Sequence, residues 1–147
     1  MKAPSLTHSD QPTTAQHILD GYSMEVSLKD IPALSAAAPK IEPGATVSIP
    51  YLPNQDNEAR LAAARAVRGL GFAPIPHLSA RRIASLAELE SFVQRAVLEA
   101  GVERCFVIAG DPSTPAGPFA DSSSLIDTGV FERAGIKVIG VGGGGGN

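Results

Sequence analysis

Residues 104–111 read RCFVIAGD, an almost continuously apolar run that ends in a glycine and an acid. Such a run is typical of a parallel strand covered on both faces, because a strand with one wet face alternates apolar and polar residues. We therefore expect a buried strand over residues 104–109. Parallel strands are joined by crossover connections, so helical segments should lie before and after it.

The segments around this strand have helical patterns. Ser85 and Glu88 have capping-box spacing, and apolar residues then recur at the spacing of one helix face up to Gly101. A second segment is rich in Ala, Leu and Arg, and Asp56 or Asn57 precedes it as a cap. We expect helices over residues 30–38, 58–70, 85–101 and 122–134, the last weakened by Gly129.

Strand patterns alternate with these helices. They are expected over residues 22–28, 46–49, 72–76, 104–109 and 136–141. Alternation of this kind predicts an α/β fold with parallel strands and right-handed crossovers. Two architectures remain open, a doubly wound sheet and part of a (β/α)8 TIM barrel. Length alone favours the doubly wound sheet, because a barrel usually takes about 250 residues.

Composition sets the broad class of the protein. The chain has 147 residues, 44% of them hydrophobic and 18% charged, a net charge of −3 and one Cys. We expect a cytoplasmic globular protein without a disulfide framework, a multi-cysteine zinc site or a general affinity for nucleic acid or membrane. Residues 1–13 are expected to be a flexible tail, residues 14–143 the folded domain and residues 144–147 a glycine-rich terminus.

Polar residues follow several of the apolar runs, where ligands bind in either architecture. Glu25 lies on the side of its strand opposite Met24 and Val26. If Glu25 faces a cavity, burial makes it a usable proton donor near neutral pH. The alternative is an edge-strand glutamate that faces solvent. The loop at residues 51–54 also follows a strand and belongs to the same set of positions.

The third and fourth strands carry the other candidates. His77 and Ser79 precede Arg81 and Arg82, which suggests a hydrogen-bond donor and a cationic cluster for an anionic ligand. Both arginines cannot easily point at one ligand, so at least one is expected to be structural, solvated or paired with an acidic helix. Asp111 at the strand tip can accept hydrogen bonds from a ligand, or form an Asx turn.

Other candidates are weaker. Cys105 lies mid-strand and is expected to be a buried small hydrophobe rather than a nucleophile. The three scattered histidines do not form a metal-site pattern. The glycine-rich segments lack the residues and the following helix that a phosphate loop or a dinucleotide fingerprint needs.

Four motifs resemble, in order and in approximate spacing, the methylenetetrahydrofolate reductase family, the flavoprotein (β/α)8 barrels of one-carbon metabolism. They are Ser23-Met24-Glu25-Val26, Pro76-His77-Leu78-Ser79, Val107-Ile108-Ala109-Gly110-Asp111 and Pro118-Phe119-Ala120-Asp121. The resemblance runs from residue 22 to residue 143. It implies the N-terminal part of a barrel, about five of its eight β/α units. One departure is Ala109, where the family commonly has arginine.

The resemblance also implies roles for single residues. Glu25 matches the acid that assists protonation of the folate nitrogen, and Asp111 matches an acid near the flavin and pterin rings. His77, Phe119 and Ala120 match flavin-contacting positions. Ser79 and Gly110 lie in the same motifs and are counted with the cofactor-binding residues.

The implied activity is that of an oxidoreductase that interconverts 5,10-methylenetetrahydrofolate and 5-methyltetrahydrofolate, in the branch of one-carbon metabolism that serves methionine biosynthesis. FAD would carry the redox chemistry and NAD(P)H would donate the hydride. A homo-oligomer with a small-molecule folate substrate is expected. Two alternatives stay open: a non-catalytic truncated or engineered half-barrel fragment, and a doubly wound domain that binds another anionic ligand.

Overall fold

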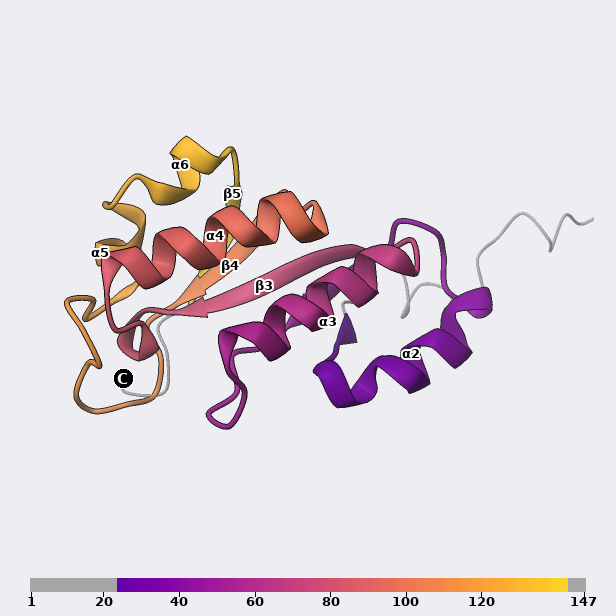
Figure 1. Cartoon of the computed structure of the whole chain (residues 1–147). Helices are drawn as coiled ribbons and strands as arrows, with labels where there is room; N and C mark the ends of the chain where they lie inside the picture. The colour runs from indigo at the N-terminus through magenta and orange to yellow at the C-terminus, as the bar shows by residue number, and fades with distance from the viewer. Residues whose placement is uncertain (1–23, 143–147) are drawn as a thin grey trace, which may run out of the picture.

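The computed structural model describes residues 24–142 and contains one five-stranded sheet (Figure 1). The expected tail, the glycine-rich terminus, residues 14–23 and residue 143 lie outside the described residues. Every neighbouring pair of strands is parallel, in the spatial order β1-β2-β3-β4-β5. The strands are β1 (Met24–Glu25), β2 (Thr46–Ile49), β3 (Ala73–Ser79), β4 (Arg104–Ile108) and β5 (Lys137–Gly142).

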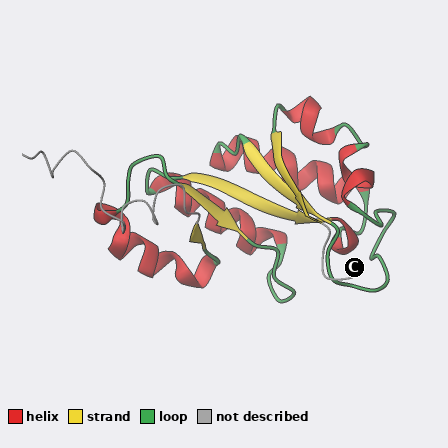
Figure 2. Cartoon of the chain, turned by 180° about the vertical axis from the view of Figure 1, so that it is seen from behind, coloured by secondary structure: helices red, strands yellow, loops and turns green. Residues whose placement is uncertain are grey.

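Helical segments separate consecutive strands, as the alternating pattern predicts. They are η2 (Leu28–Asp30), α2 (Ile31–Ala37), η3 (Ala38–Lys40), α3 (Asn57–Gly69), η4 (Ala80–Arg82), α4 (Leu86–Ala100), α5 (Ser122–Ile126) and α6 (Val130–Ala134). Helices α2, α3 and α4 lie in front of the sheet in Figure 1. Figure 2 gives the opposite view, in which the strands lie in front of these helices. The α/β class with a parallel sheet is confirmed.

The strand order bears on the two architectures that the sequence left open. A doubly wound sheet reverses its strand order at a switch point and carries helices on both faces. The five described strands follow one another without a reversal. Right-handed crossovers between strands in that order place all connecting helices on the same face.

Two strands end at least three residues away from their expected ends, and the others agree to within one residue. The strand predicted over residues 22–28 ends at Glu25, because Ser27 caps a short helix: its amide and its hydroxyl both donate to the Asp30 carboxylate at 2.8 Å. The strand predicted over residues 72–76 continues to Ser79. The amides of alternate β3 residues face β2, as the Ala73 amide does, so positions 74 and 76 face the β4 side. Because β4 pairs with β3 only from His77 onward, the missing N–H groups of the two prolines interrupt neither ladder.

The helix ends follow the sequence signals closely. The Asp56 side chain accepts from the Ala59 amide, and Gly101 ends α4 in the left-handed conformation with φ 60°. The Ser85 hydroxyl accepts from the Glu88 amide at 3.1 Å. The helix expected over residues 122–134 is split into α5 and α6 at Gly129, whose φ is 74°.

The apolar side chains form two clusters between the sheet and the helices. The main core has 20 buried residues, and its least exposed members include Leu61, Leu78, Leu89, Val93, Val107 and Leu125. The minor core has five, Val26, Leu34, Val47, Val67 and Phe72. No helix within residues 24–142 is long and apolar enough to cross a membrane.

Candidate functional site

One face of the sheet carries no described helix, and we call it the helix-free face (Figure 2). Successive side chains of a strand point to opposite faces. Because Val26, Leu78 and Val107 belong to the two cores, their strand neighbours point the other way. The residues of the helix-free face near the carboxyl ends of the strands are Glu25, Ser48, His77, Ser79, Phe106, Ile108, Gly140 and Gly142.

His77 is half-buried on this face. Its ring lies against the ring of Phe106, with the centroids 5.1 Å apart and the planes tilted by 38°. Burial lowers the pKa of His77, the charge of Arg60 lowers it further, and the charge of Glu25 opposes both. The imidazole is therefore neutral at pH 7, able to donate from one nitrogen and accept at the other.

Glu25 ends the two-residue strand β1, which is an edge of the described sheet. Its side chain is exposed rather than buried, so the desolvation that would make it a proton donor is not present in this conformation. The position does face the same side of the sheet as His77, whose pKa responds to its charge. The structure thus places these two predicted residues on the same face of the sheet, where the charge of Glu25 raises the pKa of His77.

Ser79 and Gly110 form the most tightly built part of the site. Ser79 is 1% exposed, and its hydroxyl oxygen has no hydrogen-bond partner. Gly110 has φ 100°, and a Cβ on it would lie 2.1 Å from that hydroxyl. Only glycine fits here, both for its backbone angle and for the space that the serine occupies. Buried polar groups ordinarily have a hydrogen-bond partner, and the described residues supply none for this hydroxyl.

The two arginines after β3 have different partners. The Arg81 guanidinium donates to the backbone carbonyls of Ala120, Pro112 and Ser113, at 2.8, 3.0 and 3.1 Å. Arg81 therefore holds the loop after β4 in place and is structural. The expectation that at least one of the two arginines is structural is confirmed.

Arg82 pairs with Asp111 instead of with an acidic helix. Its Nη2 and Nε atoms lie 2.5 and 3.1 Å from one Asp111 carboxylate oxygen. The hydrogen bonds from Arg82 hold the pKa of Asp111 below its ordinary value, so this carboxylate is ionised at neutral pH. The Asp111 side chain remains 64% exposed, which leaves its second oxygen accessible to a ligand.

Phe119 and Ala120 lie in the loop that Arg81 holds. Phe119 is 5% exposed and belongs to the main core, which favours a packing role for its ring. Ala120 is exposed, and its carbonyl accepts from Arg81. A Cβ on Gly117 would lie 2.2 Å from the Ala84 carbonyl oxygen, so this loop packs closely on the segment before α4. A ligand contact of this segment would come from Ala120 or from the backbone.

Arg60 is 1% exposed, although the sequence did not single it out. Its guanidinium lies between two rings, 4.1 Å from the centroid of Tyr51 and 4.5 Å from that of Phe92. It also donates to the carbonyl oxygen of His77. A signal was present: Arg60 precedes Ala63, Ala64 and Val67 by three, four and seven positions, the spacing of the buried helix face.

Cys105 is fully buried, and burial raises the pKa of its thiol to about 12, which confirms the interpretation as a small hydrophobe. Among residues 24–142 no three His, Cys, Asp or Glu side chains form a group that could hold a metal ion.

No protein-family model matches the chain.

Proposed function

We propose that the chain is a flavin-dependent reductase of the methylenetetrahydrofolate reductase type, and that its sheet is part of a (β/α)8 barrel. The observation that carries the proposal is the placement of the motif residues. Glu25, His77 and Asp111 lie at or beyond the carboxyl ends of three strands of one parallel sheet. Strands in unreversed order, with their helices on one face, are also what a segment of such a barrel has.

The residues on the helix-free face fit a flavin. Ser79 offers a buried hydroxyl without a partner, beside a glycine that admits no side chain. Gly140 and Gly142 also lack room for a Cβ, since one would lie 2.2 Å from Phe106 and 2.8 Å from Ile108, respectively. Together with His77 these residues combine apolar neighbours with few polar groups. When bound there, FAD would supply hydride transfer between NAD(P)H and the folate substrate.

Each proposed site residue then has a chemical task. Glu25 would donate a proton to the folate nitrogen as the one-carbon bridge opens, and binding of the rings over it would supply the desolvation that the exposed side chain lacks. The ionised Asp111 would accept hydrogen bonds from the N–H groups of the pterin. His77 would donate to or accept from the flavin ring as a neutral imidazole.

The proposal is tested by adding FAD to the full chain and following its visible absorbance and fluorescence. We expect binding, and a weaker affinity for Ser79→Ala than for the exposed control Ser91→Ala. Failure of the chain to perturb the flavin spectrum at any concentration would contradict the proposal.

The catalytic roles need a separate experiment with bound FAD and NAD(P)H. Glu25→Gln should abolish reduction of the folate while largely sparing flavin bleaching by NAD(P)H, because only the folate step needs the proton. Glu42→Gln, another exposed glutamate, is the matched control and should spare both steps. Equal loss of both half-reactions in Glu25→Gln would contradict the proton-donor role.

A second candidate is the non-catalytic half-barrel fragment, which the exposure of β5 favours. β5 is an edge of the described sheet and leaves Ile139 45% and Val141 60% exposed, and exposed apolar edge strands promote association. We propose the expected homo-oligomer and the cytoplasmic location with either candidate. Sedimentation equilibrium of the chain with and without FAD separates the two: an oligomer that never binds flavin supports the fragment, and flavin binding supports the reductase.

A further inference from the structure

Arg60 is a buried cation without a carboxylate at ion-pair distance among the described residues. Its Nη1 donates to the Asn57 side-chain oxygen at 3.2 Å, and Asn57 in turn donates to Glu88 at 3.2 Å. Its Nε has no hydrogen-bond partner. Burying a charge with such incomplete compensation is costly, so the contacts that Arg60 does make should have a specific use.

The Arg60 guanidinium supplies a hydrogen-bond donor to the backbone carbonyl of His77. The ladder between β2 and β3 ends where Ile49 pairs with Pro76. Alternate residues of this segment bond to β3, as the Ala45 carbonyl does, so the next ladder donor would be the Tyr51 amide, which lies beyond the end of β2 and makes no backbone hydrogen bond to His77. The His77 carbonyl faces the same neighbour as the Ala73 amide, since alternate residues of a parallel strand bond to one side. Arg60 donates to this carbonyl.

We propose that Arg60 is a positioning residue: its guanidinium replaces the missing ladder donor at the His77 carbonyl and thereby fixes the direction in which the imidazole leaves β3. The inference concerns the chain without any ligand, so it stands or falls separately from the proposed function. Removing Arg60 should let the end of β3 move and change how the His77 ring meets Phe106.

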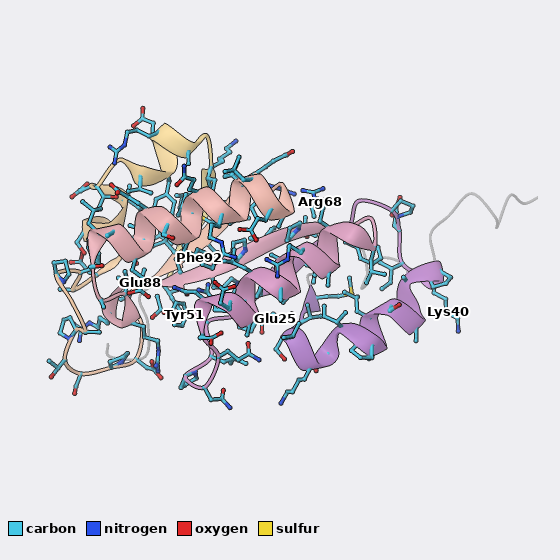
Figure 3. All side chains as sticks on the ribbon, in the orientation of Figure 1. Glu25, Lys40, Tyr51, Arg68, Glu88 and Phe92 are labelled. Carbon is cyan, nitrogen blue, oxygen red and sulfur yellow. The ribbon has the colours of Figure 1, made fainter. Side chains whose placement is uncertain are left out.

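The rings and charges around the guanidinium hold it at this place. Tyr51 comes from the loop after β2 and Phe92 from α4, so the guanidinium on α3 contacts two other parts of the fold through these rings. Tyr51, Phe92 and Glu88 lie close together in Figure 3. The charged groups that act on His77 are Glu25 of β1 and Arg60 of α3, and Arg60 lowers the pKa of the imidazole.

The test is an NMR titration of the full chain, with the His77 resonances assigned by comparison with His77→Gln. In Arg60→Met the His77 pKa should rise, because a positive charge that lowers it is removed. The nuclear Overhauser contacts between the His77 and Phe106 rings should also weaken. Phe92→Leu keeps the charge and loosens the same packing, so it should lower stability and leave the His77 pKa unchanged.

A folded Arg60→Met with native contacts between the His77 and Phe106 rings would overturn the proposal, whatever its His77 pKa. If that variant does not fold, Arg60→Lys decides. Lysine keeps the charge but lacks the planar fork that donates to Asn57 and His77 together. We expect a native-like pKa with weakened ring contacts, and native ring contacts would show that Arg60 is not needed for positioning.

Discussion

The two sides of the candidate site differ in the length of their strands and in the size of the core beneath them. His77, Ser79 and Gly110 lie over the main core, on the seven-residue strand β3 and at the end of β4. Glu25 lies on β1, which has two described residues and rests on the five-residue minor core. One side is therefore held by packing along β3 and β4, and the other by a short strand and a few apolar contacts.

Local stability should follow this difference. The β1 side is secured by the bond from the Val26 amide to the Ser48 carbonyl at 2.9 Å and by the contacts of Ser27 with Asp30. Segments with few buried contacts open at a smaller free energy than the global unfolding of the core. The proposed proton donor thus lies on the side expected to open first.

The largest expected effect comes from shortening one leucine in each core. Leu61→Ala in the main core should lower the free energy of unfolding by about 2–5 kcal/mol, the usual cost of a buried cavity. Leu34→Ala in the minor core should lie at or below the lower end of this range and mainly speed amide exchange of residues 24–37. Urea unfolding and hydrogen exchange measure both, and equal global losses would remove the distinction between the two cores.

The next effect tests how tightly the β3–β4 side is built. Gly110→Ala meets two costs, the positive φ of 100° and the overlap with the Ser79 hydroxyl at 2.1 Å. Gly71→Ala is the matched control, because φ is 91° and nothing lies within 4 Å of its Cβ. We expect about 1–2 kcal/mol for Gly71→Ala and about 1–2 kcal/mol more for Gly110→Ala.

A double variant isolates the overlap. In a Ser79→Ala background the clashing oxygen is gone, so Gly110→Ala should cost about as much as Gly71→Ala. Thermal or urea unfolding of the four chains gives the cycle. A Gly110→Ala cost that does not depend on Ser79 would mean that the serine does not fill the space beside this glycine.

Much of the fold was predictable because its signals are local. The capping residues Asp56 and Ser85 and the terminator Gly101 set the helix ends, and the apolar run at 104–108 set a buried strand. The short first strand was not predictable from alternation, because the Asp30 carboxylate competes for the backbone at Ser27. The continuation of β3 through its prolines depends on which neighbour each amide faces, which is a tertiary property.

The candidate site was predictable in its positions and less so in its contacts. Strand ends placed His77, Ser79 and Asp111 correctly on or beside one sheet. The partners of Arg81 and Arg82 could not be predicted from the sequence, because both residues lie in one short turn. Their partners lie in or beside a loop about 30 residues further along the chain, which Arg81 and Arg82 contact at different points. Arg60 was missed because charge is ordinarily a sign of exposure, and its burial depends on rings from two other segments.

The smallest effect concerns the exposed end of the β3–β4 side. Arg82→Gln should raise the pKa of the Asp111 carboxyl toward its ordinary value, since the hydrogen bonds from Arg82 are the first cause of the lowered pKa. A carboxyl titration by NMR measures this, with Lys40→Gln at the opposite end of the molecule as a control that should leave Asp111 unchanged (Figure 3). An unchanged midpoint in Arg82→Gln would show that the ion pair does not persist in solution.

The sign of the accompanying pH dependence is fixed by the direction of the shift. A carboxyl whose folded pKa lies below its unfolded value stabilises the fold above the unfolded pKa of about 3.9, and this contribution is lost as the pH falls through the folded pKa. Arg82→Gln removes the contribution, so the stability curve of the variant should fall less steeply below about pH 4 than that of the native chain. Because Asp111 is exposed, the difference should be small and should shrink further in high salt. A large, salt-independent difference in stability would instead mean that the Arg82–Asp111 pair is part of the buried packing of the β3–β4 side, together with Ser79 and Gly110.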